Sequence, residues 1–176
     1  MLRNIIFLFT FILSVSSVAW AETQITVLSD IPFKKGSNIL DAIKKECSLG
    51  AKLSDFIKES AAEKGIKVNQ GDKLGGGNQL IVNILSASAK KSVERGGWGS
   101  LSSALSGGGT SYVSIEGTYI KSGKKVGTFR GQRSSGGGFA GGFKGNCSLL
   151  GRCIKALGDD VATWLQDPEM DSRIGE

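Results

Sequence analysis

Two stretches of alternating apolar and polar residues in the middle of the chain constrain its fold most strongly. They cover residues 112–120 and 125–133, and Ser122 and Gly123 between them are residue types that favour a tight turn. Alternate residues of a strand point to the same face. In the first stretch, the apolar residues Val113, Ile115 and Tyr119 all occupy odd-numbered positions and therefore share one face. The pattern predicts an antiparallel hairpin with one face turned to a core.

Other β-rich runs predict further strands before this hairpin. Residues 25–28 and 66–68 are short runs of this kind. Residues 80–85 form a longer run, whose apolar face consists of Leu80, Val82 and Ile84. We therefore expect a sheet of about four to five strands.

Helical spacing of apolar residues predicts two helices, in the chain order β-α-β-β-β-β-α. The first covers residues 37–64, with Gly50 as the expected division into two pieces, and the second covers residues 148–165. Gly151 and Gly158 in the second helix indicate close packing on the sheet. The predicted fold class is α+β, an antiparallel or mixed sheet with two helices packed on one face.

The first 21 residues have the organisation of a secretory signal peptide. Arg3 precedes an apolar run over residues 5–13, and Ala19-Trp20-Ala21 provides a cleavage site. The run is short for a membrane span, and we expect no transmembrane span after cleavage. The expected location is periplasmic or secreted. The expected organisation is a signal peptide at 1–21, a single α+β domain at 22–167 and a flexible C-terminal tail at 168–176.

Positive charge is concentrated in the middle of the expected mature chain. Residues 87–146 contain nine Lys or Arg against two Asp or Glu, whereas residues 147–176 contain three against six. A basic surface on an exported protein suits an anionic partner, such as an anionic envelope component or an acidic protein surface. The alternative is a solvated basic sheet face that only keeps the protein soluble.

Three cysteines in an exported chain allow one disulfide and leave one thiol. If Cys147 and Cys153 lie in one helix, they are about 9 Å apart along its axis, beyond the reach of a disulfide. A bridge is therefore expected to join Cys47 to one of them. Cys153 falls in the apolar stripe of the helix, whereas Cys147 lies at its start. This favours Cys47 with Cys147 and leaves Cys47 with Cys153 as the alternative.

The absence of histidine excludes several classes of catalytic and metal site. A Ser-His-Asp triad, a Cys-His dyad and an imidazole-based metal centre all require it. Gly109 is followed by Thr110-Ser111, where a phosphate-binding loop needs a lysine, so no nucleotide is expected. The spacing of Phe139 and Phe143 differs from that of RNA-recognition motifs, and no nucleic acid is expected. We assign no catalytic residue, cofactor or metal.

The basic segment contains aromatic residues between glycines, which is typical of contact surfaces. Two glycine-rich loops are expected, at residues 96–109 and 134–145. The candidate binding surface consists of Trp98, Arg130, Arg133, Phe139, Phe143 and Lys144. The alternative for Trp98 is that its side chain folds back over an edge of the core.

Four stretches of the chain resemble small exported proteins of Gram-negative bacteria that have no assigned function. They are residues 46–50 (ECSLG), 136–139 (GGGF), 143–147 (FKGNC) and 160–168 (DVATWLQDP). The resemblance covers most of the mature chain. It implies a periplasmic location and a link between Cys47 and Cys147, and it supplies no substrate and no catalytic residue.

These features predict a non-enzymatic periplasmic protein that binds an envelope component or a protein partner through a basic, glycine-rich surface. One alternative is a histidine-free carbohydrate-active enzyme that uses Glu94 or Glu116, the only acidic residues of the basic segment. Pairing of these carboxylates with nearby Lys or Arg is the simpler role. Another alternative is a purely structural envelope protein.

Overall fold

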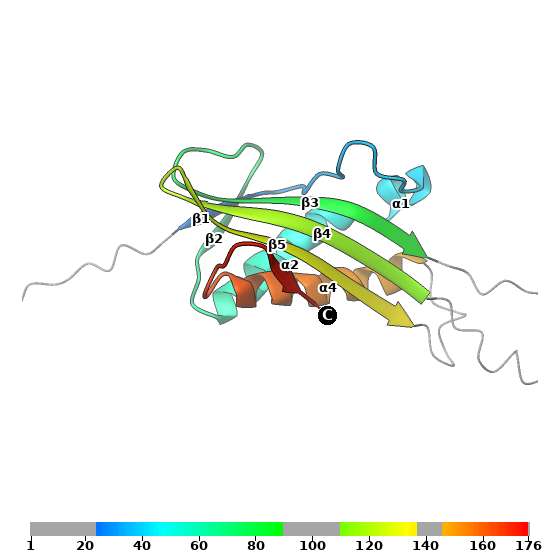
Figure 1. Ribbon diagram of the computed structural model, residues 1–176. Helices are drawn as coiled ribbons and strands as arrows, with labels where there is room; N and C mark the ends of the chain where they lie inside the picture. The colour runs from blue at the N-terminus through cyan, green and yellow to red at the C-terminus, as the bar shows by residue number, and fades with distance from the viewer. Residues whose placement is uncertain (1–23, 90–109, 137–145, 176) are drawn as a thin grey trace, which may run out of the picture.

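The computed structural model describes residues 24–89, 110–136 and 146–175 (Figure 1). In chain order the elements are β1 (Ile25–Leu28), α1 (Asp41–Glu46), α2 (Leu49–Glu63), β2 (Val68–Gly71), β3 (Asn78–Ala89), β4 (Thr110–Lys121), β5 (Lys124–Gly136), α4 (Asn146–Trp164) and β6 (Ser172–Ile174). The α+β class predicted from the sequence is confirmed.

The six strands form one mixed sheet in the order β2-β1-β3-β4-β5-β6. Strand β1 is parallel to both of its neighbours, β2 and β3, and β6 is parallel to β5. The two central pairs, β3 with β4 and β4 with β5, are antiparallel. Parallel pairing of β1 with β2 is possible because α1 and α2 provide the long connection that parallel neighbours require.

Helices α2 and α4 pack against each other and cover one face of the sheet (Figure 1). No described helix packs on the other face, which we call the uncovered face. The alternation of the strands directs their apolar residues toward these helices. Leu80, Val82 and Ile84 of β3 and Val113, Ile115 and Tyr119 of β4 are buried there against Leu53, Ile57, Leu150, Ile154 and Leu157 of the helices. One apolar layer between the sheet and the helices therefore forms the core.

The first predicted helix is divided at Ser48, not at Gly50. Ser48 has a φ of 48°, in the left-handed region through which a right-handed helix does not continue. Gly50 lies in the first turn of α2, where a Cβ atom would overlap the carbonyl oxygen of Ile31. This glycine therefore permits close approach of α2 to the chain after β1, and the prediction that it divides the helix is wrong.

Gly158 marks the place where α4 comes closest to α2. A Cβ atom on Gly158 would lie 2.6 Å from the Cβ of Phe56 and 2.9 Å from its carbonyl carbon. At Gly151, in contrast, a Cβ atom would meet nothing within 4 Å. The prediction that both glycines mark packing on the sheet is wrong, because Gly158 packs on α2 and Gly151 has open space beside it among the described residues.

A one-residue irregularity in the β4–β5 hairpin determines which side chains share a face. Lys121 pairs with Lys124 at the turn, and the pairing shifts by one residue between Tyr119 and Ile120. Beyond this shift Glu116 lies opposite Arg130. Because side chains alternate between faces, a register without the shift would bring a residue of the opposite face to this position.

Glycines of β4 and β5 make room for aromatic side chains on the covered face. A side chain on Gly117 would overlap the ring of Phe129, its cross-strand partner. Phe129 in turn packs edge-on against Trp164 of α4, with the ring centroids 4.8 Å apart. The absence of a side chain at Gly117 therefore allows the ring of Phe129 to cover part of the sheet that another side chain would fill.

The C-terminal residues contain a strand that the sequence did not predict. Residues 172–174 pair with residues 129–131 of β5, in the segment that was expected to be a flexible tail. Nε1 of Trp164 donates a hydrogen bond to Oγ of Ser172 at 3.1 Å, and Ile174 packs where Gly131 lacks a side chain. This sixth strand explains why the strand count exceeds the four to five expected.

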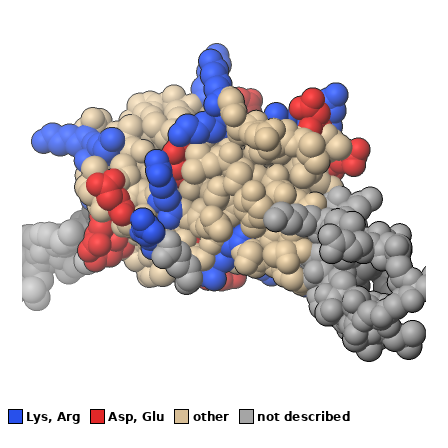
Figure 2. Space-filling view, turned by 45° about the vertical axis from the view of Figure 1, so that its right-hand side comes forward, with Lys and Arg blue, Asp and Glu red and all other residues tan. Residues whose placement is uncertain are grey.

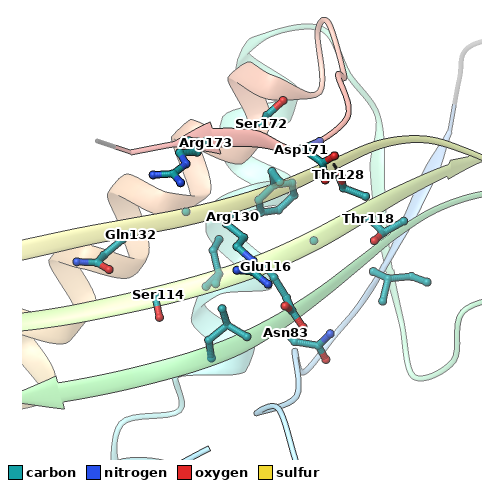
Figure 3. A pocket seen from close by; sticks show the side chains of 16 residues that line it. Asn83, Ser114, Glu116, Thr118, Thr128, Arg130, Gln132, Asp171, Ser172 and Arg173 are labelled. Carbon is teal, nitrogen blue, oxygen red and sulfur yellow. Dashed lines mark hydrogen bonds between the residues drawn. The ribbon is translucent and has the colours of Figure 1, made fainter.

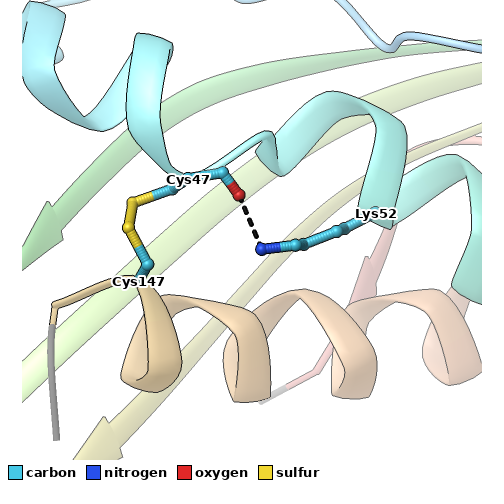
Figure 4. Close-up of a disulfide and its surroundings, with 3 residues drawn as sticks. All are labelled: Cys47, Lys52 and Cys147. Carbon is cyan, nitrogen blue, oxygen red and sulfur yellow. Dashed lines mark hydrogen bonds between the residues drawn. A yellow bond between two sulfur atoms is a disulfide. The ribbon is translucent and has the colours of Figure 1, made fainter.

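Cys47 and Cys147 form a disulfide across 100 residues of the chain (Figure 4). The bond ties the residue that follows α1 to the first turn of α4. Nζ of Lys52 donates a hydrogen bond to the carbonyl oxygen of Cys47 at 2.9 Å. The pairing is the one that the sequence favoured. Cys153 is left as a buried free thiol, and its Sγ donates to the carbonyl oxygen of Ser111 at 3.6 Å.

We expect Cys153 to be chemically inert in the folded protein. Its side chain is buried, and burial raises the pKa of the Cys153 thiol, so little of the reactive thiolate is present near neutral pH. A thiol-specific chromogenic reagent should leave the native protein unlabelled and should modify one cysteine per chain after unfolding in urea. Rapid labelling of the native protein would contradict both the burial of Cys153 and the assigned pairing.

Candidate functional site

A groove of about 680 Å³ lies on the uncovered face of the sheet (Figure 3). Strands β3, β4 and β5 form its floor, and residues 171–173 line one side. Ile81 and Leu85 contribute apolar surface among mostly polar side chains. Leu85 lies where the pairing of β3 with β4 is shifted, and such bulges re-aim side chains. A hollow with apolar surface and a few polar groups is the usual form of a binding site.

Four side chains form a polar row across the groove. The strand register places Asn83, Glu116, Arg130 and Arg173 opposite one another on the successive strands β3, β4, β5 and β6. Directly opposite residues of neighbouring strands have their Cβ atoms about 5 Å apart. The row therefore has a carboxylate near its centre and two adjacent arginines at the β5–β6 end.

Glu116 is held by an ion pair with Lys34. Nζ of Lys34 lies 2.9 Å from Oε1 of Glu116 and donates a hydrogen bond to Oε2 at 3.0 Å. Lys34 is in place because its backbone N–H donates to the carbonyl oxygen of Ile84, while the N–H of Ile84 donates to the carbonyl oxygen of Pro32. The ion pair corresponds to the simpler role that the sequence suggested for Glu116.

The turn before β6 is attached to β5 by a pair of hydrogen bonds. Oγ1 of Thr128 donates to Oδ1 of Asp171 at 3.2 Å and accepts from the backbone N–H of Asp171 at 2.8 Å. Asp171 has a φ of 56°, a left-handed conformation that aspartate tolerates better than most residues. These bonds position the chain that carries Arg173 into the groove. Sequence reasoning missed Asp171 and Arg173, because the tail shows no strand pattern.

Arg133 lies on the other face of the sheet from Arg130. Its guanidinium binds the carboxylate of Asp160 on α4 through two hydrogen bonds, from Nε at 2.7 Å and from Nη2 at 2.6 Å. This hydrogen bonding raises the pKa of the Arg133 guanidinium. Bidentate pairing of this kind fastens β5 to α4. The structure therefore does not bring Arg130 and Arg133 together into one surface.

The other residues of the candidate binding surface lie outside the described residues, namely Trp98, Phe139, Phe143 and Lys144. The same holds for Glu94. The described residues that flank these segments are Ala89, Thr110 and Gly136. Thr110 pairs with Gly136, and Ala89 pairs with the residue after Thr110. Ala89, Thr110 and Gly136 therefore lie at the same end of the sheet, opposite the β4–β5 turn.

Charged groups are dispersed over the face that Figure 2 shows. Figure 2 shows Lys and Arg side chains projecting at separate places around a broad area of uncharged residues, with acidic side chains among them. Within the described residues no group of three or more His, Cys, Asp or Glu side chains could hold a metal ion. In the same part of the chain, every helix is too short or too polar to span a bilayer.

The chain matches no protein-family model. It also matches no curated protein. Several solved structures are similar to it at low sequence identity. A minor lipoprotein of Acinetobacter baumannii is 9% identical, with a TM-score of 0.42 over 82% of this chain and 92% of its own. The PelC dodecamer of Paraburkholderia phytofirmans is 11% identical, with a TM-score of 0.41 over 78% and 84%. A lipoprotein of Neisseria meningitidis is 14% identical, with a TM-score of 0.40 over 80% and 99%.

Proposed function

We propose that the protein is exported to the periplasm and binds an envelope component or a protein partner there without catalysing a reaction. The observation that carries this proposal is the groove of about 680 Å³ on the uncovered face of the sheet. Among the described residues, the helices that pack on the sheet lie on the opposite face and leave the groove accessible to a large partner. The signal-peptide pattern of residues 1–21 supports the periplasmic location.

The polar row in the groove favours a partner with an anionic group. Arg130 is exposed and lies opposite Arg173 on the neighbouring strand. The exposed guanidinium of Arg130 can donate two parallel hydrogen bonds to a carboxylate or phosphate of a partner. Asn83 and the Lys34–Glu116 pair provide neutral and charged hydrogen-bonding groups along the same row. The groove thus suits a partner that is both polar and acidic.

Covalent capture in living cells tests this proposal. A photoreactive amino acid at Gln132, an exposed residue that lines the groove, should crosslink to a specific partner. The same amino acid at Glu59, exposed on α2 in the helix layer, should not capture that partner. Capture at both positions, or at neither, would contradict the groove as the binding site.

Substitution of Arg130 should weaken the captured interaction. Because a hydrogen bond to a charged group is worth about 1.5–3 kcal/mol, we expect Arg130→Ala to lower affinity for the identified partner at least about tenfold. The matched control is Arg152→Ala, which removes an exposed arginine from α4. Equal effects of the two substitutions would mean that net charge, and not the groove, determines binding.

A further inference from the structure

The turn between β4 and β5 carries three exposed lysines: Lys121, Lys124 and Lys125. We call this segment, residues 121–125, the lysine hairpin. Within the part of the chain that the structure describes, these three side chains form no ion pair. Lys121 and Lys124 pair directly across the turn, where two like charges repel each other. An external anion would reduce this repulsion.

The lysine hairpin lies at the end of the sheet where the chain enters the described fold. The backbone N–H of Ser122 donates a hydrogen bond to Oδ1 of Asn78 at 3.2 Å, and Nδ2 of Asn78 donates to the carbonyl oxygen of Gln24 at 3.5 Å. Gln24 follows the expected cleavage site, after Ala21, by three residues, which span at most about 11 Å. The lysine hairpin is therefore close to the new N-terminus that cleavage after Ala21 would produce.

We propose that the lysine hairpin docks the protein onto a lipid surface that carries anionic phosphate headgroups. A lysine near such a surface is attracted strongly enough to change the binding constant about fivefold, so three lysines together account for about 100-fold. Lys121 and Lys124 lie opposite each other at the tip of two paired strands, and Lys125 follows on the other face of the same tip. An anionic surface that meets the tip end-on can therefore approach all three lysines without the ordering of a loop. The tip is at the end of β4 and β5, whereas the groove lies on their face, so both contacts can form at once.

Sedimentation with lipid vesicles tests the docking surface. The exported, processed protein should bind vesicles of phosphatidylcholine that contain about 30% phosphatidylglycerol, and should not bind phosphatidylcholine alone. The combined substitution Lys121→Gln, Lys124→Gln and Lys125→Gln should weaken binding about 100-fold. Because these side chains are exposed at a turn and their mutual repulsion is removed, we expect a melting temperature that is unchanged or slightly higher, which circular dichroism would verify.

A matched variant separates the hairpin from net charge. Lys35→Gln, Lys45→Gln and Lys155→Gln remove the same charge from exposed positions elsewhere and should change binding less than about threefold. Equal losses in the two triple variants, or no binding of the unsubstituted protein, would overturn the proposal. Displacement by inorganic phosphate at constant ionic strength would also overturn it, by indicating a small-anion site.

The groove variant makes the two proposals independent. Arg130→Ala should bind the anionic vesicles as the unsubstituted protein does, because Arg130 lies on the face of the sheet. If Arg130→Ala abolished vesicle binding and the hairpin variant retained it, the lipid would occupy the groove and the hairpin proposal would be wrong.

Discussion

Replacing Cys47 and Cys147 together with alanine is expected to lower the free energy of unfolding by about 3–5 kcal/mol. The bond joins residues 100 positions apart, and a cross-link that closes so long a loop removes much conformational freedom from the unfolded chain. The bond also joins the start of α4 to the junction of α1 and α2. Its loss therefore removes the covalent link between these helices. Urea unfolding followed by tryptophan fluorescence measures the difference.

The control for this experiment is Cys153→Ala, which removes a buried cysteine that forms no disulfide. It leaves a small cavity and should cost only about 1 kcal/mol. A reducing agent should destabilise the unsubstituted protein and Cys153→Ala, and it should have no effect on the double variant. A double variant as stable as the unsubstituted protein would show that the link contributes nothing.

Substituting alanine for the two glycines of α4 is expected to have opposite effects. Gly158→Ala should lower the free energy of unfolding by about 1–3 kcal/mol, because the new methyl group would push against the side chain and backbone of Phe56. Gly151→Ala should raise it by up to about 1 kcal/mol, because alanine favours the helix and its side chain meets open space. Thermal unfolding of the two purified variants provides the comparison.

The pair serves as its own control, because the same chemical change is made seven residues apart in one helix. A generic effect of removing glycine would shift both melting temperatures in the same direction. That outcome would contradict the close contact between α2 and α4 at Gly158.

The parts of the fold that could be predicted are those with repeated local signals. The period of two revealed the strands around the β4–β5 turn, and the helical period revealed both long helices. The parallel placement of β1 between β2 and β3 depends on distant pairing and leaves no local trace. Strand β6, at 172–174, is too short to show a period. Gly50 and Gly158 were recognised as special, but the neighbour that each contacts is set by the tertiary fold.

The candidate site was only partly accessible from the sequence. Arg130 and Arg133 are three residues apart, and the strand period alone would have placed them on opposite faces. The pairing of Glu116 with Arg130 depends on the register shift in the hairpin, for which the sequence carries no recognisable signal. Lys34 reaches the site because the chain after β1 runs beside β3, which no residue pattern indicates.

The link between Cys47 and Cys147 has a further consequence for the export that we propose. Thiols remain reduced in the bacterial cytoplasm and are oxidised in the periplasm. Without the bond, the precursor lacks stabilisation that is a sizeable fraction of the 5–15 kcal/mol or so typical of a folded domain. Under the proposed export, the precursor would therefore stay closer to the unfolded form in which a polypeptide passes through a narrow channel. Oxidation after the proposed export would then stabilise the folded form, so the same bond that closes a 100-residue loop would also prevent the exported protein from unfolding again.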